Sequence, residues 1–193
     1  MDRRLLAWAR AGLRRGANVP PLWLFTDSRR LPDPRRAVAR LPRGLAGVVL
    51  RHDTDPNRAA LGRDLARICH ARRLTLVVAG DARLAATLHA GVHLRSGRWP
   101  GSQRRSQGLI TSSAHGLADL RRAYCAGASL AFLSPVFATA SHPSARVLGP
   151  LRWGHIACAA PLPLAALGGV DGGNIRRLPQ RFCQAVGAIA ALV

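Results

Sequence analysis

The stretch LTLVVAGDARLAATLHAGVHL, residues 74–94, contains the unit that decides the fold. Residues 74–79 are a short run of mostly branched apolar residues, which predicts a strand buried on both faces. Residues 82–89 predict a short helix, and GVHL at 91–94 predicts a second short strand. A strand, a helix and a strand in this order favour parallel pairing through a helical crossover.

The same unit recurs on both sides of this stretch. The further predicted strands are 22–27, 47–51, 108–112, 129–134, 163–168 and 185–193, and the further predicted helices are 33–41, 57–72, 117–126 and 172–178. Eight parallel strands are the number that closes a barrel. We therefore predict an α/β protein with a single (β/α)8 TIM barrel as its one domain, residues 1–193, its last helix missing or truncated. An open doubly wound sheet is the alternative, although no strand is followed by a GxGxxG or P-loop motif.

The chain carries a net charge of +20, from 29 basic and 9 acidic residues. Every basic residue is arginine and every acidic residue is aspartate, and the arginines are spread along the whole chain. This dispersed pattern, without an RNA-binding motif, favours a solvated surface over a nucleic-acid-binding patch, although it would attract anionic substrates. No apolar run approaches the roughly 18 residues that cross a bilayer. We therefore expect neither nucleic acid nor a membrane as a partner.

The first 16 residues are rich in arginine but lack the long apolar segment and small-residue cleavage site of a secretory signal. A transit peptide is the alternative interpretation, since such peptides are also rich in arginine and poor in acids. Because the segment continues directly into the first predicted strand, we expect a cytoplasmic protein. The four cysteines form no CxxC pair, and we expect all four to be buried free thiols.

In barrels of this kind, the working residues follow the C-terminal ends of the strands. Gly168-Gly169 follows the seventh predicted strand, where bare backbone N–H groups can approach a phosphate and the helix predicted at 172–178 adds its positive end. A plain tight turn is the alternative. The segment 134–143 contains several hydroxyl groups and an imidazole, which suit hydrogen bonding to a phosphate or a pyrimidine; an ordinary surface loop is the alternative.

Charged and imidazole side chains follow other predicted strands. Arg51 ends the second strand, where a phosphate would be its natural bidentate partner. An internal ion pair with Asp53 or Asp27 is the alternative. His93 and His115 also lie at strand ends, and each can be either a structural or a catalytic histidine.

Several motifs occur in a fixed order along residues 20–192. They are LWLFTD (22–27), VVLR (48–51), GVHL (91–94), SSAH (112–115), SPVFATASHP (134–143) and LAALGGVDGGNI (164–175). In this order they resemble the thiamine phosphate synthase and TenI family of barrels. The resemblance implies a transferase of thiamine biosynthesis. Such an enzyme joins hydroxymethylpyrimidine pyrophosphate to thiazole phosphate through a pyrimidine cation, and it releases pyrophosphate.

The resemblance also implies roles for individual residues. Arg51 and Ser113 would face the pyrophosphate. His142 stands where the family has a lysine, which makes it a third catalytic candidate.

The implied substrate-binding residues lie later in the chain. Thr139 and Ser141 would contact the pyrimidine and thiazole groups. Gly168 and Gly169, with the backbone near Ala190, would hold the thiazole phosphate; Ala190 replaces a serine that the family has on its eighth strand.

The chain departs from the family where a Mg²⁺ ion would bind. The family's Asn-Asp after the third strand falls on Ala79-Gly80, so that Asp81, one place later, is the remaining metal candidate, and an acidic ligand after the fourth strand falls on Arg98. Because Mg²⁺ needs hard oxygen ligands, these changes argue against the usual metal site. These changes have two interpretations. Arg95 and Arg98 take over part of the charge of the metal, or catalysis is lost and only phosphate binding remains.

Two functions remain open at this point. One is the synthase, and the other is a catalytically altered or inactive relative that binds a thiazole or thiamine phosphate. The TenI branch of thiazole tautomerases has a histidine where this chain has Pro135, which cannot transfer protons. We expect small phosphorylated heterocycles as ligands, and a homodimer that covers apolar surface left open by the last helix.

Overall fold

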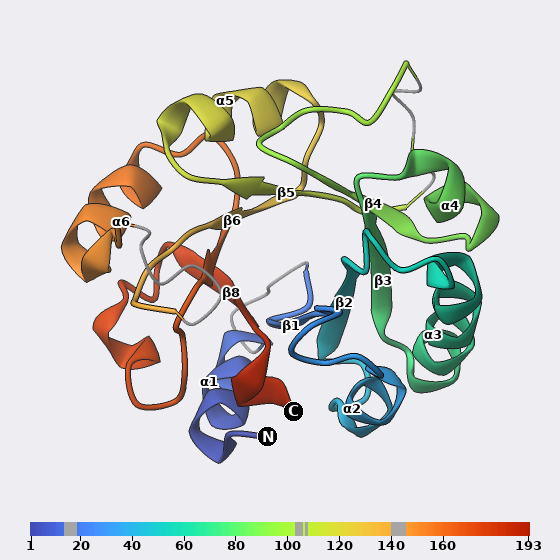
Figure 1. The fold of residues 1–193 in the computed structure, drawn as a ribbon. Helices are drawn as coiled ribbons and strands as arrows, with labels where there is room; N and C mark the ends of the chain where they lie inside the picture. The colour runs from blue at the N-terminus through green and yellow to red at the C-terminus, as the bar shows by residue number, and fades with distance from the viewer. Residues whose placement is uncertain (14–18, 103–105, 107, 140–145) are drawn as a thin grey trace.

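The structure describes residues 1–13, 19–102, 106, 108–139 and 146–193. In this computed structural model, eight parallel strands close into a barrel in chain order, and helices surround it (Figure 1). The TIM-barrel prediction is therefore confirmed, and the open sheet is wrong. No helix in the described ranges combines the length and hydropathy that a membrane span requires.

The strands and helices alternate along most of the chain. The strands are β1 (Leu22–Phe25), β2 (Ala46–Leu50), β3 (Thr75–Ala79), β4 (Gly91–Leu94), β5 (Ile110–Ala114), β6 (Leu130–Leu133), β7 (Leu164–Leu167) and β8 (Cys183–Ala188). The helices are α1 (Arg3–Leu13), α2 (Arg35–Arg40), α3 (Arg58–Arg72), α4 (Ala82–Thr87), α5 (Leu117–Cys125) and α6 (Gly149–Cys158), with the 3-10 turns η1 (Ile175–Arg177) and η2 (Ala190–Leu192).

Aromatic side chains fill the interior of the barrel. Along β1, Trp23 and Phe25 belong to the interior cluster, whereas the alternate residues Leu22 and Leu24 belong to the cluster that faces the helices. Phe132 of β6 meets Phe25 edge to face, with ring centroids 4.8 Å apart. This packing fills the interior of the barrel with side chains, so that the barrel is a packed core and not an open pore.

Helix α6 is absent from the predicted elements but is well formed. It carries a proline in its first turn, where the missing N–H costs nothing. Its fully buried Trp153 donates to the backbone carbonyl of Leu133 at 3.3 Å, which attaches the helix to β6.

Helix α1 is the second element that the sequence analysis missed. It lies beside β8 and the C-terminal segment, where a helix following β8 would otherwise pack (Figure 1). Leu5 and Ala9 are fully buried in its face toward the barrel, and the Asp2 N–H donates to the carbonyl of Ala191 at 3.1 Å. The homodimer stays a prediction, but the uncovered apolar surface on which it was based is packed against α1.

The last two predicted elements need correction. The strand predicted at 185–193 spans Cys183–Ala188 and is followed by η2. The helix predicted at 172–178 is the single 3-10 turn η1, and the N–H groups of the two residues before it are bound by an aspartate. Asp171 Oδ1 accepts from the N–H groups of Gly173 and Asn174 at 2.8 and 2.9 Å, so no helix dipole is directed at the preceding glycines.

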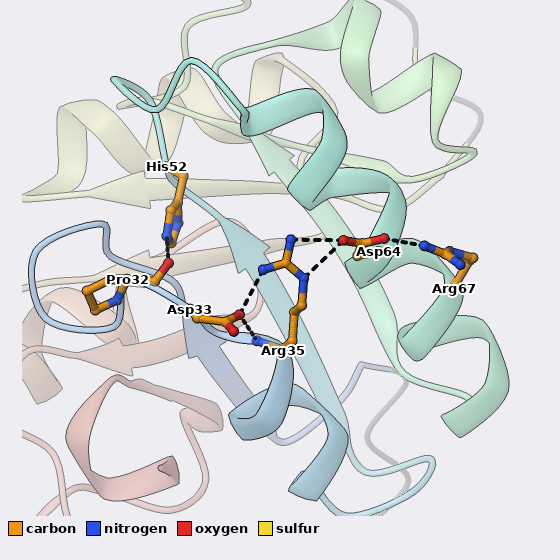
Figure 2. A network of polar contacts seen from close by, with 6 residues as sticks. All are labelled: Pro32, Asp33, Arg35, His52, Asp64 and Arg67. Carbon is orange, nitrogen blue, oxygen red and sulfur yellow. Dashed lines mark hydrogen bonds and ion pairs between the residues drawn. The ribbon is translucent and has the colours of Figure 1, made fainter.

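Surface arginines on α2 and α3 are used in ion pairs. Arg35 binds Asp33 at 3.0 Å and Asp64 at 2.8 Å, and Asp64 also pairs with Arg67 (Figure 2). Hydrogen bonds from Arg35 and then Arg67 hold the pKa of Asp64 below its ordinary value. These contacts join two neighbouring helices, which is the solvated-surface role expected of the dispersed arginines.

The cysteines divide into two pairs. Cys69 and Cys183 are buried, as expected, but Cys125 and Cys158 are exposed, so the prediction of four buried thiols is wrong for these two. Burial raises the pKa of both Cys69 and Cys183 to about 12. Because the thiolate is the reactive form, we expect the native protein to release two equivalents of chromophore from Ellman's reagent at pH 8, and four after unfolding. Fast reaction of all four thiols in the folded protein would contradict the barrel packing.

Candidate active site

A cavity of about 1030 Å³ opens at the C-terminal ends of the strands. The residues proposed from the sequence that line it are Arg51, Ser113, Thr139, Gly168, Gly169 and Ala190. Phe25 and His93 also contribute to the lining, with ring centroids 5.5 Å apart. Two other proposed residues, Ser141 and His142, lie outside the described residues.

Arg51 is held at the cavity wall through its backbone. Its N–H donates to Thr26 Oγ1 at 2.9 Å, and this hydroxyl also lies 2.9 Å from His52 Nδ1. His52 Nε2 lies 3.2 Å from the carbonyl of Pro32, which can only accept, so Nε2 carries the proton and Nδ1 accepts from Thr26 (Figure 2). This buried chain of hydrogen bonds joins the ends of β1 and β2 and positions Arg51.

The guanidinium of Arg51 has no hydrogen bond or ion pair with another described residue. No hydrogen bond or ion pair joins it to Asp53 or Asp27 among the described residues, although its charge acts on Asp27 through space. Asp53 binds Arg58 and Arg95, and Asp27 accepts from the N–H groups of Arg29 and Arg30. Arg51 is therefore available to bind an anion in the cavity.

His52→Ala is expected to lower the free energy of unfolding by about 1–3 kcal/mol, since it leaves the hydroxyl proton of Thr26 and the Pro32 carbonyl without their hydrogen-bond partner. Urea unfolding measures this loss. His70→Ala, at an exposed position on α3, is the matched control and should change stability by less than about 0.5 kcal/mol. Equal effects of the two substitutions would show that the hydrogen-bond chain does not stabilise the barrel rim.

The β4–β5 part of the rim is a tight turn held by two serines. Ser113 Oγ accepts from the N–H of Ser96 at 3.1 Å, and Ser112 Oγ accepts from the N–H of Gly97 at 2.9 Å. These bonds fix the turn that carries Arg95 into the cavity lining. Ser113 thus supports the turn as well as lining the cavity, a role that the sequence did not indicate.

The β7 part of the rim is a glycine pair packed against the loop after β6. Gly168 and Gly169 have φ angles of +92° and +65°, in the left-handed region that favours glycine. A Cβ at Gly169 would collide with the carbonyl oxygen of Ala138, so a side chain would displace the loop. The Gly169 N–H has no hydrogen-bond partner among the residues that the structure describes, which leaves it available to an anion.

The two strand-end histidines differ in what they can do. His93 is buried, and burial together with the positive charges of Arg51 and Arg95 lowers its pKa to about 3. It is therefore neutral near pH 7, and its Nδ1 lies 2.9 Å from Thr111 Oγ1. His115 Nδ1 donates to the carbonyl of Ser134 at 2.9 Å, which leaves Nε2 as the open nitrogen at the rim.

The residues near the expected metal site do not fit a Mg²⁺ ion. Asp81 caps α4 by accepting from the N–H of Leu84 at 2.9 Å, and its other oxygen lies 3.7 Å from Arg58 Nη1. In the described ranges, no three His, Cys, Asp or Glu side chains gather in a group that could hold a metal. Arg98, at the position of the second acid, lines a separate cavity beside Trp99.

Asp2 is a cavity residue that the sequence analysis missed. Its Oδ2 accepts from the N–H of Gly172 at 2.7 Å, and its Oδ1 accepts from the N–H of Arg4 at 2.8 Å. Asp2 therefore caps α1 and ties that helix to the loop after β7. An aspartate before an apolar helical repeat is a recognisable capping signal, but nothing in the sequence indicates that this cap lies at the cavity.

The fold and the cavity define a class: a (β/α)8 barrel whose cavity at the C-terminal ends of the strands is lined by charged and small polar residues. The family model of thiamine monophosphate synthase matches residues 22–192. The chain therefore belongs to the thiamine monophosphate synthase family.

Curated relatives agree with this assignment, and a solved structure shares the fold. Thiamine-phosphate synthase of Halorhodospira halophila is 31% identical over 183 residues, which cover 83% of this chain and 81% of that protein. The protein of the same name from Synechococcus sp. (strain WH7803) is 33% identical over 167 residues, 82% of this chain but only 47% of that protein. The chain thus spans about half the length of this relative. Thiamine phosphate pyrophosphorylase from Pyrococcus furiosus has the same fold, with a TM-score of 0.74 at 23% identity over 89% of this chain and 86% of that one.

Proposed function

We propose that the protein joins hydroxymethylpyrimidine pyrophosphate to thiazole phosphate, forming thiamine phosphate and releasing pyrophosphate. The observation that carries this proposal is a single cavity with two separate places for an anion. Arg51 and Arg95 supply cationic groups on the β2–β4 arc of the rim, and Gly169 supplies a bare N–H on the β7 arc. A reaction between two phosphorylated substrates requires such an arrangement.

In this reaction the protein mainly positions the two substrates and neutralises the charge of the leaving pyrophosphate. The bond between the pyrimidine methylene carbon and the pyrophosphate oxygen breaks, and the electron pair leaves with pyrophosphate, while the carbon bonds to the thiazole. Arg51 would stabilise the leaving charge, and the N–H of Gly169 would hold the thiazole phosphate within reach of the cation. His93, neutral beside Phe25, adds no further positive charge near the pyrimidine.

A second function is favoured by a specific observation. Asp53 and Asp81, the acids that follow β2 and β3, are both in ion pairs with arginine, so neither is left open for the metal ion of a metal-dependent synthase. A family member that binds a thiazole or thiamine phosphate without turnover would keep the anion sites alone. A cytoplasmic location and a homodimer remain predictions for either function.

The experiment that separates the two functions uses the full chain with both substrates. Thiamine phosphate is converted to its fluorescent thiochrome derivative and quantified, and thiamine phosphate binding is measured by calorimetry in parallel. We expect product to accumulate at a rate proportional to protein concentration. Binding without product would support the second function, and neither binding nor product would overturn both.

A further inference from the structure

Two carboxylates beside the cavity are bound by arginines rather than left open. Asp53 follows β2, and its two oxygens contact Arg58 Nη2 at 3.2 Å and Arg95 Nη2 at 2.7 Å. Asp81 follows β3 and shares Arg58, whose Nη1 lies 3.7 Å from Oδ2. Each acid therefore already holds a cation that belongs to the chain.

The guanidinium of Arg95 packs against the backbone of Gly80. Gly80, at φ +65°, faces its guanidinium so closely that a Cβ there would lie 3.0 Å from Nε and 3.1 Å from Cζ and Nη2. The N–H groups of Ser96 and Gly97 donate to the hydroxyls of Ser113 and Ser112, which fixes the backbone directly after Arg95. These contacts hold the positive charge of the Arg95 guanidinium beside Gly80 at the rim, where no ion from solution is needed to supply it.

Arg95 has more N–H donors than its ion pair with Asp53 uses. A guanidinium has five N–H groups in a fixed fork, and the ion pair with Asp53 uses Nη2. Among the described residues, Nε and Nη1 have no partner. Arg95 lines the same cavity as Arg51, so the two guanidinium groups can bind one polyanion together.

We propose that this cavity binds the diphosphate group of its substrate without a divalent cation, and that Arg95, held by Asp53, takes the charge-neutralising place of the metal. The inference rests on the proposed function, because that function supplies the diphosphate. Asp53 is then a positioning residue rather than a metal ligand. Arg58 contacts both Asp53 and Asp81, so that each of these acids is paired with an arginine.

Calorimetric titration of the full chain with inorganic pyrophosphate tests the proposal without turnover. We expect pyrophosphate to bind in EDTA, and Arg95→Ala to weaken this binding at least tenfold. Arg98→Ala is the matched control, since it removes the same charge from the same turn but lines a different cavity, and should leave binding unchanged. Binding that needs Mg²⁺, or an Arg95→Ala variant that binds like the wild type, would overturn the proposal.

Asp53→Asn distinguishes a positioning role of Asp53 from a role as a metal ligand. If Asp53 only positions Arg95, the variant still binds pyrophosphate in EDTA to within about threefold, because an amide oxygen can also accept from a guanidinium. If Asp53 is a metal ligand, the variant loses binding that depends on Mg²⁺. Absence of pyrophosphate binding by the wild type in both EDTA and Mg²⁺ would instead count against the proposed function itself.

Discussion

Arg51→Ala is expected to weaken pyrophosphate binding at least tenfold and to lower kcat/KM about 100-fold, the loss typical of one preorganised donor to a developing anion. The physical reason is that Arg51 lies in the cavity wall with no described partner for its guanidinium. The fold should remain intact, since the contact with Thr26 is made by the backbone N–H of Arg51. Calorimetry and initial rates measure the two effects.

Arg63→Ala is the control for Arg51, because it removes the same charge from an exposed position on α3. It should change affinity less than twofold, as a distant charge is screened at ordinary ionic strength. If both variants lose affinity equally, the anion is attracted by the net charge of the surface and not by a built site.

Gly169→Ala is expected to lower the free energy of unfolding by about 2–4 kcal/mol and to weaken thiazole phosphate binding at least tenfold. Any side chain at φ +65° is strained, and this Cβ would also collide with the Ala138 carbonyl and lie 2.9 Å from the Phe137 Cβ. Relief of the collision would move the N–H proposed to bind the phosphate. Urea unfolding and calorimetry measure the two losses.

Gly44→Ala separates the backbone strain from the collision. Gly44 has a similar φ of +70°, but nothing lies within 4 Å of the added Cβ. It should lose only about 1–2 kcal/mol and bind the phosphate normally. If the two variants have equal stability and equal affinity, the loop at Gly169 is not tightly packed and does not hold the ligand.

The strands could be predicted because burial on both faces gives each of them a short continuous apolar run. The run at β3 (Thr75–Ala79) and the run at β6 (Leu130–Leu133) begin and end within one residue of their predicted bounds. The strand predicted at 185–193 extended too far because Ile189 to Val193 are as apolar as a strand. Of these residues only Leu192 is buried, and the segment instead forms η2, which is tied to the start of α1 by the bond from the Asp2 N–H to the Ala191 carbonyl, a long-range contact with no local signal.

The two missed helices differ in their local patterns. In α1, the buried Leu5, Trp8 and Ala9 have the spacing of one helix face, so a local helix signal is present, although an arginine-rich amphipathic start also fits a transit peptide. In α6, Gly149, Pro150 and Gly154 are poor helix formers, and the tertiary contact of Trp153 with β6 compensates for them.

The position of the site could be predicted from topology alone, because the C-terminal ends of parallel strands meet at one rim. That rule brought Arg51 and Gly169 into one cavity although 118 positions separate them in the sequence. The ion pairs of Asp53 could not be predicted, since they follow from the side-chain geometry of Arg58 at the start of α3 and of Arg95 after β4. Of the two arginines expected to replace the metal, only Arg95 lines this cavity.

A crystal structure of the protein with thiamine phosphate and pyrophosphate would show which groups bind each anion. We expect pyrophosphate within hydrogen-bonding distance of Arg51 and Arg95, and the phosphate of thiamine phosphate on the N–H of Gly169. Both anions bound to arginines on the outer helices, with the barrel mouth empty, would contradict this expectation.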